Sequence, residues 1–212
     1  LREMTVEERA AGLADGAARW FSGNRADHGK NVTELSRVTG FSEPVVAAGL
    51  DRLFGAATAP EILKWWKRRD RPVSAVRSVL IVSAGNIPGV SLFPAMGCLL
   101  AGVPVMIKSA TAEPVSAPLW LDQLRDAAPR LAESVICTTW PGGDRAIEDV
   151  LFDGVDRIMV YGRDETVEDL AKRCAGKVSG YGTGISFAVI GDAAEHDARA
   201  ARLLALDMAL WD

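Results

Sequence analysis

Residues 78–107 form a run of thirty positions without a single charged side chain. A run of this length could cross a bilayer as one helix. Its interior argues against that structure, because Pro88, Pro94, Pro104 and several glycines would break the helix repeatedly. Lipid cannot satisfy the backbone groups that such breaks set free. The segment therefore predicts buried strands and a buried helix joined by tight turns, and no membrane span.

From residue 78 onward, short apolar runs rich in β-branched residues alternate with amphipathic stretches. This alternation is typical of a parallel sheet covered by helices on both faces. It predicts strands at residues 78–83, 103–108, 134–139, 157–161 and 186–190, and helices near residues 90–101, 117–131, 144–152, 165–175 and 196–211. Five successive β-α units indicate an α/β fold with a doubly wound, mostly parallel, Rossmann-like sheet. Its ligand site is expected at the carboxyl ends of the strands.

The first third of the chain predicts helices at residues 5–21, 42–57 and 60–69, with residues 23–33 as a polar connection. We therefore divide the chain into an N-terminal helical segment, 1–77, and an NAD(P)-binding Rossmann-like domain, 78–212. The chain begins without a methionine and stops inside helical texture. We expect both ends to be cut and the catalytic domain to be absent.

Composition restricts the classes of partner. The chain has 24 Lys and Arg against 28 Asp and Glu, a net charge of −4, which disfavours nucleic-acid binding. Cys98, Cys137 and Cys174 show no C-x-x-C spacing, and His28 and His196 stand among polar residues, so no metal site is expected. No secretory signal opens the chain, and a reducing, cytoplasmic setting fits best.

The turn at residues 83–89 joins the first predicted strand to a helix. Backbone N–H groups and the helix dipole favour negative charge there, and the side-chain amide of Asn86 can donate a hydrogen bond. The turn does not match the G-x-G-x-x-G fingerprint. An asparagine that merely tolerates positive φ explains the turn equally well.

Two further turns follow predicted strands, and a third stretch leads into the last predicted strand. Lys108 ends an apolar strand and is followed by the hydroxyls of Ser109 and Thr111, although a lone lysine there is often only the first solvated residue. Arg163 follows Gly162 and could clamp a phosphate or pair with the adjacent aspartate. Residues 180–186 carry three alternating glycines that allow close backbone approach or form a plain bend. Their common position, after strands and before helices or the next strand, favours a ligand site.

Several of these stretches resemble the cofactor domain of the aldehyde dehydrogenase superfamily. The stretches are residues 81–88 (IVSAGNIP), Pro94-Ala95, Ala101-Gly102 and residues 105–109 (VMIKS). Residues 184–190 (GISFAVI) and 207–212 (DMALWD) are most similar to the LuxC-type acyl-CoA reductases, which make fatty aldehydes for bacterial luminescence and related pathways. The resemblance covers residues 78–212.

The resemblance assigns roles to individual residues. It implies that Asn86 donates to the oxyanion of the reacting thioester, that Lys108 contacts the adenosine ribose, and that Gly162 and Arg163 lie by the cofactor pyrophosphate. Arg163 departs from the small hydroxyl residue that the family usually has there. The expected cofactor-binding set is completed by Ser83, Ala84, Ser109, Thr111 and Gly182.

The resemblance also bears on the reaction. NAD-dependent relatives commonly carry a glutamate where Thr111 stands, and its absence removes the repulsion of a 2′-phosphate, so NADPH is the expected cofactor. Hydrolytic relatives carry a glutamate base in the stretch that corresponds to residues 180–183, where this chain has no carboxylate. This absence favours a thioester enzyme that reduces acyl-CoA through a cysteine thiolate. That cysteine is expected beyond Asp212, so the fragment alone should be inactive.

Two other hypotheses stay open. One is a different superfamily member, such as another CoA-acylating aldehyde dehydrogenase or a γ-glutamyl phosphate reductase relative. The other is a non-catalytic nucleotide-binding module. For the leading hypothesis the expected partners are the acyl-CoA substrate, an acyl-protein synthetase and further copies of the full-length protein.

Overall fold

A computed structural model of the chain describes residues 1, 3–21, 26–68, 76–184, 187–189, 191 and 197–210, except the side chains of residues 20, 21, 26, 27 and 209. Within this part, five parallel strands form one sheet in the order β3-β2-β1-β4-β5. The strands are β1 (Val79–Val82), β2 (Val105–Lys108), β3 (Val135–Thr138), β4 (Arg157–Tyr161) and β5 (Val178–Tyr181). The predicted α/β, doubly wound fold is confirmed.

The apolar strand residues face alternate sides of the sheet, as the strand period requires. Val79 and Ile81 of β1 join the larger apolar core, whereas Leu80 joins a smaller core on the opposite face. Both faces are buried, which explains why the strand sequence is almost continuously hydrophobic instead of alternating with polar residues.

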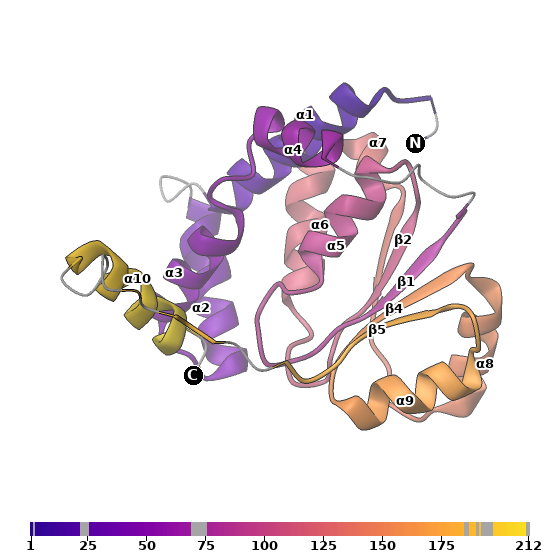
Figure 1. Cartoon of the computed structure of the whole chain (residues 1–212). Coiled ribbons are helices and arrows are strands. Elements are labelled where there is room, and N and C mark those ends of the chain that lie inside the picture. The colour runs from indigo at the N-terminus through magenta and orange to yellow at the C-terminus, as the bar shows by residue number, and fades with distance from the viewer. Residues whose placement is uncertain are drawn as a thin grey trace.

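Helices cover both faces of the sheet (Figure 1). The first face carries α5 (Leu92–Leu100), α6 (Ser116–Ala127) and the short α7 (Pro129–Ala132), and the second carries α8 (Arg145–Gly154) and α9 (Asp164–Arg173). The chain changes face between β3 and β4, so β1 has β2 on one side and β4 on the other. This reversal of strand order is where doubly wound sheets bind ligands, at the carboxyl edge.

Four N-terminal helices form a further layer over α5 and α6. They are α1 (Val6–Phe21), α2 (Ala26–Thr39), α3 (Glu43–Phe54) and α4 (Ala59–Lys67); near the end of the chain lies α10 (Ala198–Ala209). Arg9 of α1 donates through Nε to the carbonyl of Leu100, 3.0 Å away, at the end of α5. Residues of α1 to α4 share the larger core with β1, α5 and α6. The division at residue 77 stays a prediction.

The predicted polar connection at residues 23–33 is wrong from residue 26 onward, because α2 begins at Ala26. Residues 23–25 lie outside the described part of the chain. The helix is polar overall, but Val32 and Leu35 are spaced for one helical face and are buried in the larger core. Packing of this narrow apolar stripe stabilises a helix that composition alone does not predict.

The predicted strand at residues 186–190 is also wrong where the structure describes it. Phe187 and Val189 are 86% and 94% exposed and lie in no strand, while residues 186 and 190 are not described. The fifth strand instead precedes them at residues 178–181 and pairs with β4. It contains Ser179 and Gly180, which have low strand propensity, so its hydrogen-bonding neighbour and not its composition determines the strand.

The single helix predicted at residues 117–131 is divided into α6 and α7. Ala128, between them, has φ −147° and ψ 73°, outside the helical region. Pro129 follows it, and a proline disfavours helical geometry in the preceding residue and lacks the N–H of an internal helix position.

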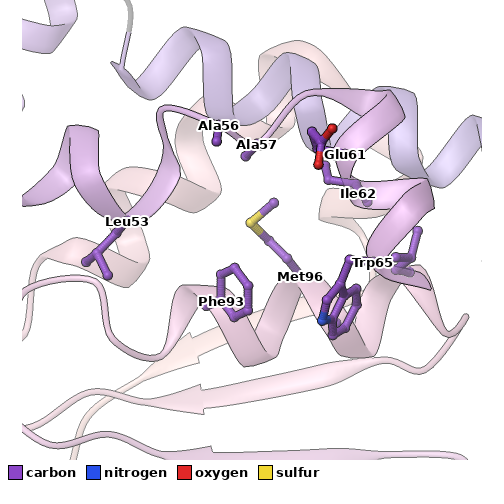
Figure 2. A pocket seen from close by; sticks show the side chains of 10 residues that line it. Leu53, Ala56, Ala57, Glu61, Ile62, Trp65, Phe93 and Met96 are labelled. Atoms are coloured by element: carbon purple, nitrogen blue, oxygen red, sulfur yellow. The ribbon is translucent and has the colours of Figure 1, made fainter. Parts of the chain in front are cut away.

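The N-terminal helices and α5 enclose a small apolar pocket of about 190 Å³ (Figure 2). Its lining residues come from the end of α3, the following loop, α4 and one face of α5.

Within the described residues, no helix combines the length and apolarity that crossing a bilayer requires.

Candidate cofactor and catalytic site

A groove of about 800 Å³ runs along the carboxyl edge of the sheet, beside the ends of β1, β2, β4 and β5. Eight of the nine predicted site residues line it: Ser83, Ala84, Asn86, Lys108, Thr111, Gly162, Arg163 and Gly182. Ser109 is the exception. It is buried, and its N–H donates to the carbonyl of Thr138 at 2.9 Å, so it continues the pairing of β2 with β3 at the carboxyl end of the sheet.

The turn that carries Asn86 is held by its neighbours. A Cβ placed on Gly85 would lie 3.0 Å from the Cβ atoms of Ala110 and Ala112, so the turn packs closely on the loop after β2. The buried carboxylate of Glu113 accepts hydrogen bonds from Ser116 at the start of α6 and from the backbone of Gly89. The exposed Asn86 side chain therefore stands on a well-supported backbone.

Lys108 extends from β2 toward the face covered by α8 and α9. Its ammonium lies 5.6 Å from the ring centroid of Trp140, in the geometry of a cation–π contact. Burial lowers the pKa of Lys108, and the carboxylate of Glu148 acts in the opposite direction. A second hollow of about 400 Å³ surrounds this side chain and shares five lining residues with the first groove: Val82, Lys108, Gly142, Arg163 and Thr166.

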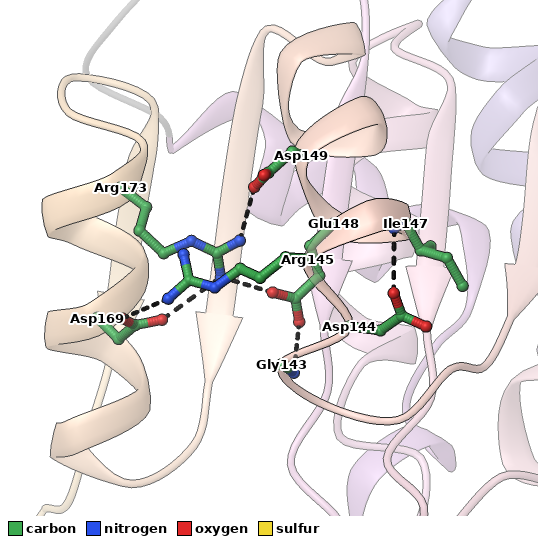
Figure 3. A network of polar contacts seen from close by, with 8 residues as sticks. All are labelled: Gly143, Asp144, Arg145, Ile147, Glu148, Asp149, Asp169 and Arg173. Carbon is green, nitrogen blue, oxygen red and sulfur yellow. Dashed lines mark hydrogen bonds and ion pairs between the residues drawn. The ribbon is translucent and has the colours of Figure 1, made fainter.

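The wall of the second hollow is an ion-pair network centred on Arg173 of α9 (Figure 3). Arg173 contacts Glu148 at 2.5 Å, Asp149 at 2.9 Å and Asp169 at 3.4 Å. Glu148 also accepts from the N–H of Gly143 at 2.9 Å. Burial alone would raise the pKa of Glu148, but these donors hold it below its ordinary value. The network ties α8, α9 and the loop after β3 together.

The first turn of α9 carries two carboxylates, and their negative charge disfavours an anion at this helix N-terminus. Asp164 and Glu165 lie in its first turn. Asp164 accepts a hydrogen bond of 2.8 Å from the N–H of Thr183. A Cβ on Gly182 would collide with the same carboxylate, so this glycine allows the chain after β5 to pass close to α9. Positive charge for a bound phosphate can instead come from Arg163 and Lys108, which both line the two hollows.

One buried polar atom beside these hollows, Oγ of Ser83, has no hydrogen-bond partner among the described residues. An unmet buried donor or acceptor is costly. Ser83 lines the groove. A ligand with hydroxyl groups, such as a dinucleotide, would supply a partner for this atom, so the residues present fit such a cofactor.

Comparison with protein families decides the identity. The family model for acyl-CoA reductase (LuxC) matches residues 13–212, nearly the whole chain. The chain belongs to the LuxC family of acyl-CoA reductases. The predicted resemblance is thereby confirmed. No curated protein matches the sequence of this LuxC-family chain.

Solved structures show the same fold in aldehyde dehydrogenases. Succinic semialdehyde dehydrogenase from Streptococcus pyogenes, in complex with NADP+, has 17% identity and a TM-score of 0.68, over 86% of this chain and 42% of that one. Glyceraldehyde-3-phosphate dehydrogenase from Methanocaldococcus jannaschii, in complex with NADP, has 13% identity and a TM-score of 0.70, over 87% and 43%. An NAD-dependent benzaldehyde dehydrogenase from Corynebacterium glutamicum has 15% identity and a TM-score of 0.66, over 84% and 42%. The LuxC-family chain thus spans about two fifths of the length of these neighbours.

Sequence reasoning missed an aromatic pair in the groove. The rings of Tyr161 and Tyr181 stack with centroids 4.6 Å apart and planes 6° apart. Burial is the main cause that raises the pKa of Tyr161 to about 12, and the neighbouring Tyr181 acts in the same direction. The phenol of Tyr161 is therefore neutral near neutral pH. Only the register of the strands reveals this pair, because Tyr161 and Tyr181 are partners at the ends of β4 and β5. The sequence instead predicts Tyr181 in a glycine-rich stretch that leads into a later strand.

The three cysteines of the LuxC-family chain lie outside the groove. None is among its described lining residues. Burial raises the pKa of the Cys98 thiol to about 11 and that of Cys137 to about 12, which keeps both protonated and unreactive at neutral pH. The described residues also contain no group of three or more His, Cys, Asp or Glu that could hold a metal.

Proposed function

We propose that this chain is the N-terminal, cofactor-binding part of an NADPH-dependent reductase that converts fatty acyl-CoA to fatty aldehyde through a cysteine thioester. The observation that carries the proposal is the common groove of Asn86 and Lys108 at the reversal of strand order, in a member of the acyl-CoA reductase family. Doubly wound sheets bind dinucleotides at such a position.

The proposed roles of the residues are those that the family resemblance implies, and their places in the groove support them. Lys108 would bind the ribose next to the adenine, and Ser83 Oγ would bond a cofactor hydroxyl or amide. Gly162 and Arg163 would lie by the pyrophosphate, with the guanidinium offsetting the carboxylates of the first turn of α9. Ala84, Thr111 and Gly182 complete the lining, and Ser109 holds the end of β2. The bound cofactor supplies the hydride.

The chemistry requires a thiolate that attacks the thioester carbonyl, so that a new C–S bond forms and CoA leaves as its thiol. Asn86 would donate to the carbonyl oxygen as negative charge develops on it, both in this step and when hydride reduces the acyl group. Collapse of the reduced adduct then releases the aldehyde and restores the thiolate. Cys98 and Cys137 are protonated and outside the groove, so the proposal places the nucleophile elsewhere in the parent protein.

The direct test is NADPH oxidation by the intact natural protein in the presence of acyl-CoA, with the aldehyde trapped as a hydrazone and free CoA measured in parallel. The expected result is one aldehyde and one CoA for each NADPH consumed. Alkylation of thiols before the assay should abolish the reaction. Consumption of acyl-CoA with release of carboxylic acid and no NADPH oxidation would contradict the proposal.

Cofactor choice gives a prediction at Thr111, which is exposed at the groove. In the intact protein, Thr111→Glu should weaken NADPH binding at least about tenfold, because the new carboxylate repels the 2′-phosphate. NADH binding should be unchanged or tighter. Quenching of protein fluorescence by each cofactor measures both affinities. The control is Thr111→Gln, because glutamine has the length of glutamate without its charge. Equal losses of NADPH affinity in both variants would rule out charge repulsion as the cause.

The remaining parts of the proposal concern the parent protein in the cell. Activated fatty acids must be supplied as thioesters or acyl-enzyme, so an acyl-protein synthetase is the proposed partner. The proposed assembly is a homo-oligomer and the proposed location is the cytoplasm.

A further inference from the structure

Glu113 is a buried carboxylate to which the proposed reaction gives no role. It is 4% exposed and ends the turn of residues 110–113, in which its N–H donates to the carbonyl of Ala110 at 3.1 Å. The same turn presents Thr111 to the cofactor groove. A buried carboxylate is costly unless hydrogen bonds compensate for its lost hydration. The groups that donate to Glu113 therefore indicate what it does.

Three of these hydrogen bonds lie at the start of α6. Oε1 accepts from the backbone N–H groups of Val115 at 3.0 Å and Ser116 at 2.7 Å, and Oε2 accepts from the hydroxyl of Ser116 at 2.5 Å. Serine, threonine, asparagine and aspartate usually fill such capping positions, because a short side chain reaches these N–H groups. Capping α6 therefore does not require the additional methylene of a glutamate.

A further hydrogen bond comes from the turn that carries Asn86. Gly89, in this turn, is buried, has φ +75° and donates its backbone N–H to Glu113. Buried backbone N–H groups are almost always paired in folded proteins, so Glu113 supplies a partner that this turn needs. Burial raises the pKa of Glu113, and the donors of both segments act in the opposite direction. One carboxylate thus joins the start of α6 to the Asn86 turn.

The two turns also pack directly on each other. A Cβ on Gly85, the residue before Asn86, would lie 3.0 Å from the Cβ atoms of both Ala110 and Ala112. The Asn86 turn is therefore held at two points, by this close packing on one side of Asn86 and by the bond to Glu113 on the other. The side chain of Asn86 is exposed between them, so its direction depends on the backbone that these contacts fix.

We infer that Glu113 is a positioning residue for Asn86, because it bonds α6 and the Asn86 turn at once and so fixes where the side-chain amide points in the groove. The inference rests on the proposed function, which takes Asn86 to be the oxyanion donor. A donor stabilises a developing charge only if it is aimed at the oxygen that carries it. A displacement of about 1 Å can cost about 10²-fold in rate.

Glu113→Asp separates the two roles of the carboxylate. The shorter side chain can still accept from the N–H groups at the start of α6, as capping aspartates do, but it ends one methylene short of Gly89. Glu113→Ala removes both roles. The control for lost stability is Leu35→Ala, which opens a cavity in the core. Leu35 is fully buried on α2 and is not among the lining residues of the groove.

The experiment combines steady-state kinetics of the intact natural protein with hydrogen–deuterium exchange measured by mass spectrometry. Glu113→Asp should lower kcat for acyl-CoA reduction at least about tenfold, with the NADPH KM within about threefold of the unmodified value. Exchange should become faster in residues 85–90 and stay unchanged in α6. Glu113→Ala should lower kcat at least as far and also speed exchange at the start of α6. Leu35→Ala should lower the midpoint of thermal unfolding and leave kcat unchanged.

A double variant tests whether Glu113 acts through Asn86. In the Asn86→Ala background, Glu113→Asp should lower kcat by less than about twofold, because the group that it positions is gone. If the two single losses multiply instead, Glu113 acts independently of Asn86 and the inference is overturned. An unchanged kcat in Glu113→Asp would overturn it as well, even if exchange in the turn becomes faster.

Failure of the proposed function gives a different result. If the unmodified protein reduces no acyl-CoA, the proposed function is overturned, and exchange alone then decides whether Glu113 holds the Asn86 turn. Unchanged exchange in residues 85–90 of Glu113→Asp would show that it does not. Because the aspartate keeps the cap of α6, a failure of Glu113→Ala to fold leaves this test intact.

Discussion

Replacement of Asn86 by alanine in the intact protein should lower kcat/KM for acyl-CoA reduction by about 10²–10³-fold. This is the effect of removing one oxyanion donor from sites that stabilise a developing charge on a carbonyl oxygen. The side chain is exposed in the groove and its turn is held by backbone and side-chain contacts from Gly85 and Glu113, so the fold should tolerate the change. Steady-state kinetics with acyl-CoA and NADPH measures the loss.

Asn86→Asp sharpens the experiment. It keeps the size of the side chain but replaces the amide donor with a carboxylate that repels the developing charge, so the loss should exceed that of the alanine variant. NADPH affinity and the midpoint of thermal unfolding should stay near those of the unmodified protein in both variants. A large kcat/KM in the aspartate variant would show that Asn86 does not stabilise the oxyanion.

The second large effect is on stability. Glu148→Gln should lower the free energy of unfolding by about 2–3 kcal/mol, because it leaves the mostly buried Arg173 without its closest partner. Arg173 and Glu148 are 13% and 8% exposed and meet at 2.5 Å. The two other carboxylates of the network, Asp149 and Asp169, are 67% and 52% exposed and compensate in part. Urea unfolding followed by circular dichroism measures the difference.

The effect should depend on pH with a defined sign. The pKa of Glu148 is lower in the folded protein than its ordinary value of 4.5. Its stabilisation is therefore fully present above that value and is lost as pH falls through the lower, folded-state pKa. The gap between the unmodified protein and Glu148→Gln should narrow under acid. The control is Glu3→Gln, which removes an exposed pair with Arg130 and should change stability by less than about 1 kcal/mol. An equal loss in both variants would exclude a special role for burial.

The part of the fold that the sequence predicted is the part encoded locally. Residues 79–82 and 105–108 are apolar and β-branched, and the turns after them contain the residues that a sheet edge exposes. Because parallel strands place their carboxyl ends on one edge, this pattern was enough to bring Asn86 and Lys108 into one groove. The roles assigned to these residues stay predictions for the kinetic and binding experiments.

The errors of prediction lie where local sequence carries little information. β5 contains serine and glycine and exists because β4 offers it hydrogen bonds, and α2 is a polar segment stabilised by two buried side chains. The stack of Tyr161 on Tyr181 depends on the register of two strands, and the Arg173 network joins two helices. Such contacts depend on which elements become neighbours in the folded chain. Local sequence patterns do not show this.

The sequence by itself thus determined that this chain folds as a doubly wound sheet with polar side chains at one edge. The apolar periodicity indicates the strands and helices, and the turn residues indicate the polar edge, because both patterns reflect local backbone geometry. The tertiary structure alone decided which strands pair at the edges, which charges meet under α8 and α9, and that α3, α4 and α5 enclose an apolar hollow. These features arise from long-range packing, in which each side chain is stabilised by partners that are distant in the sequence.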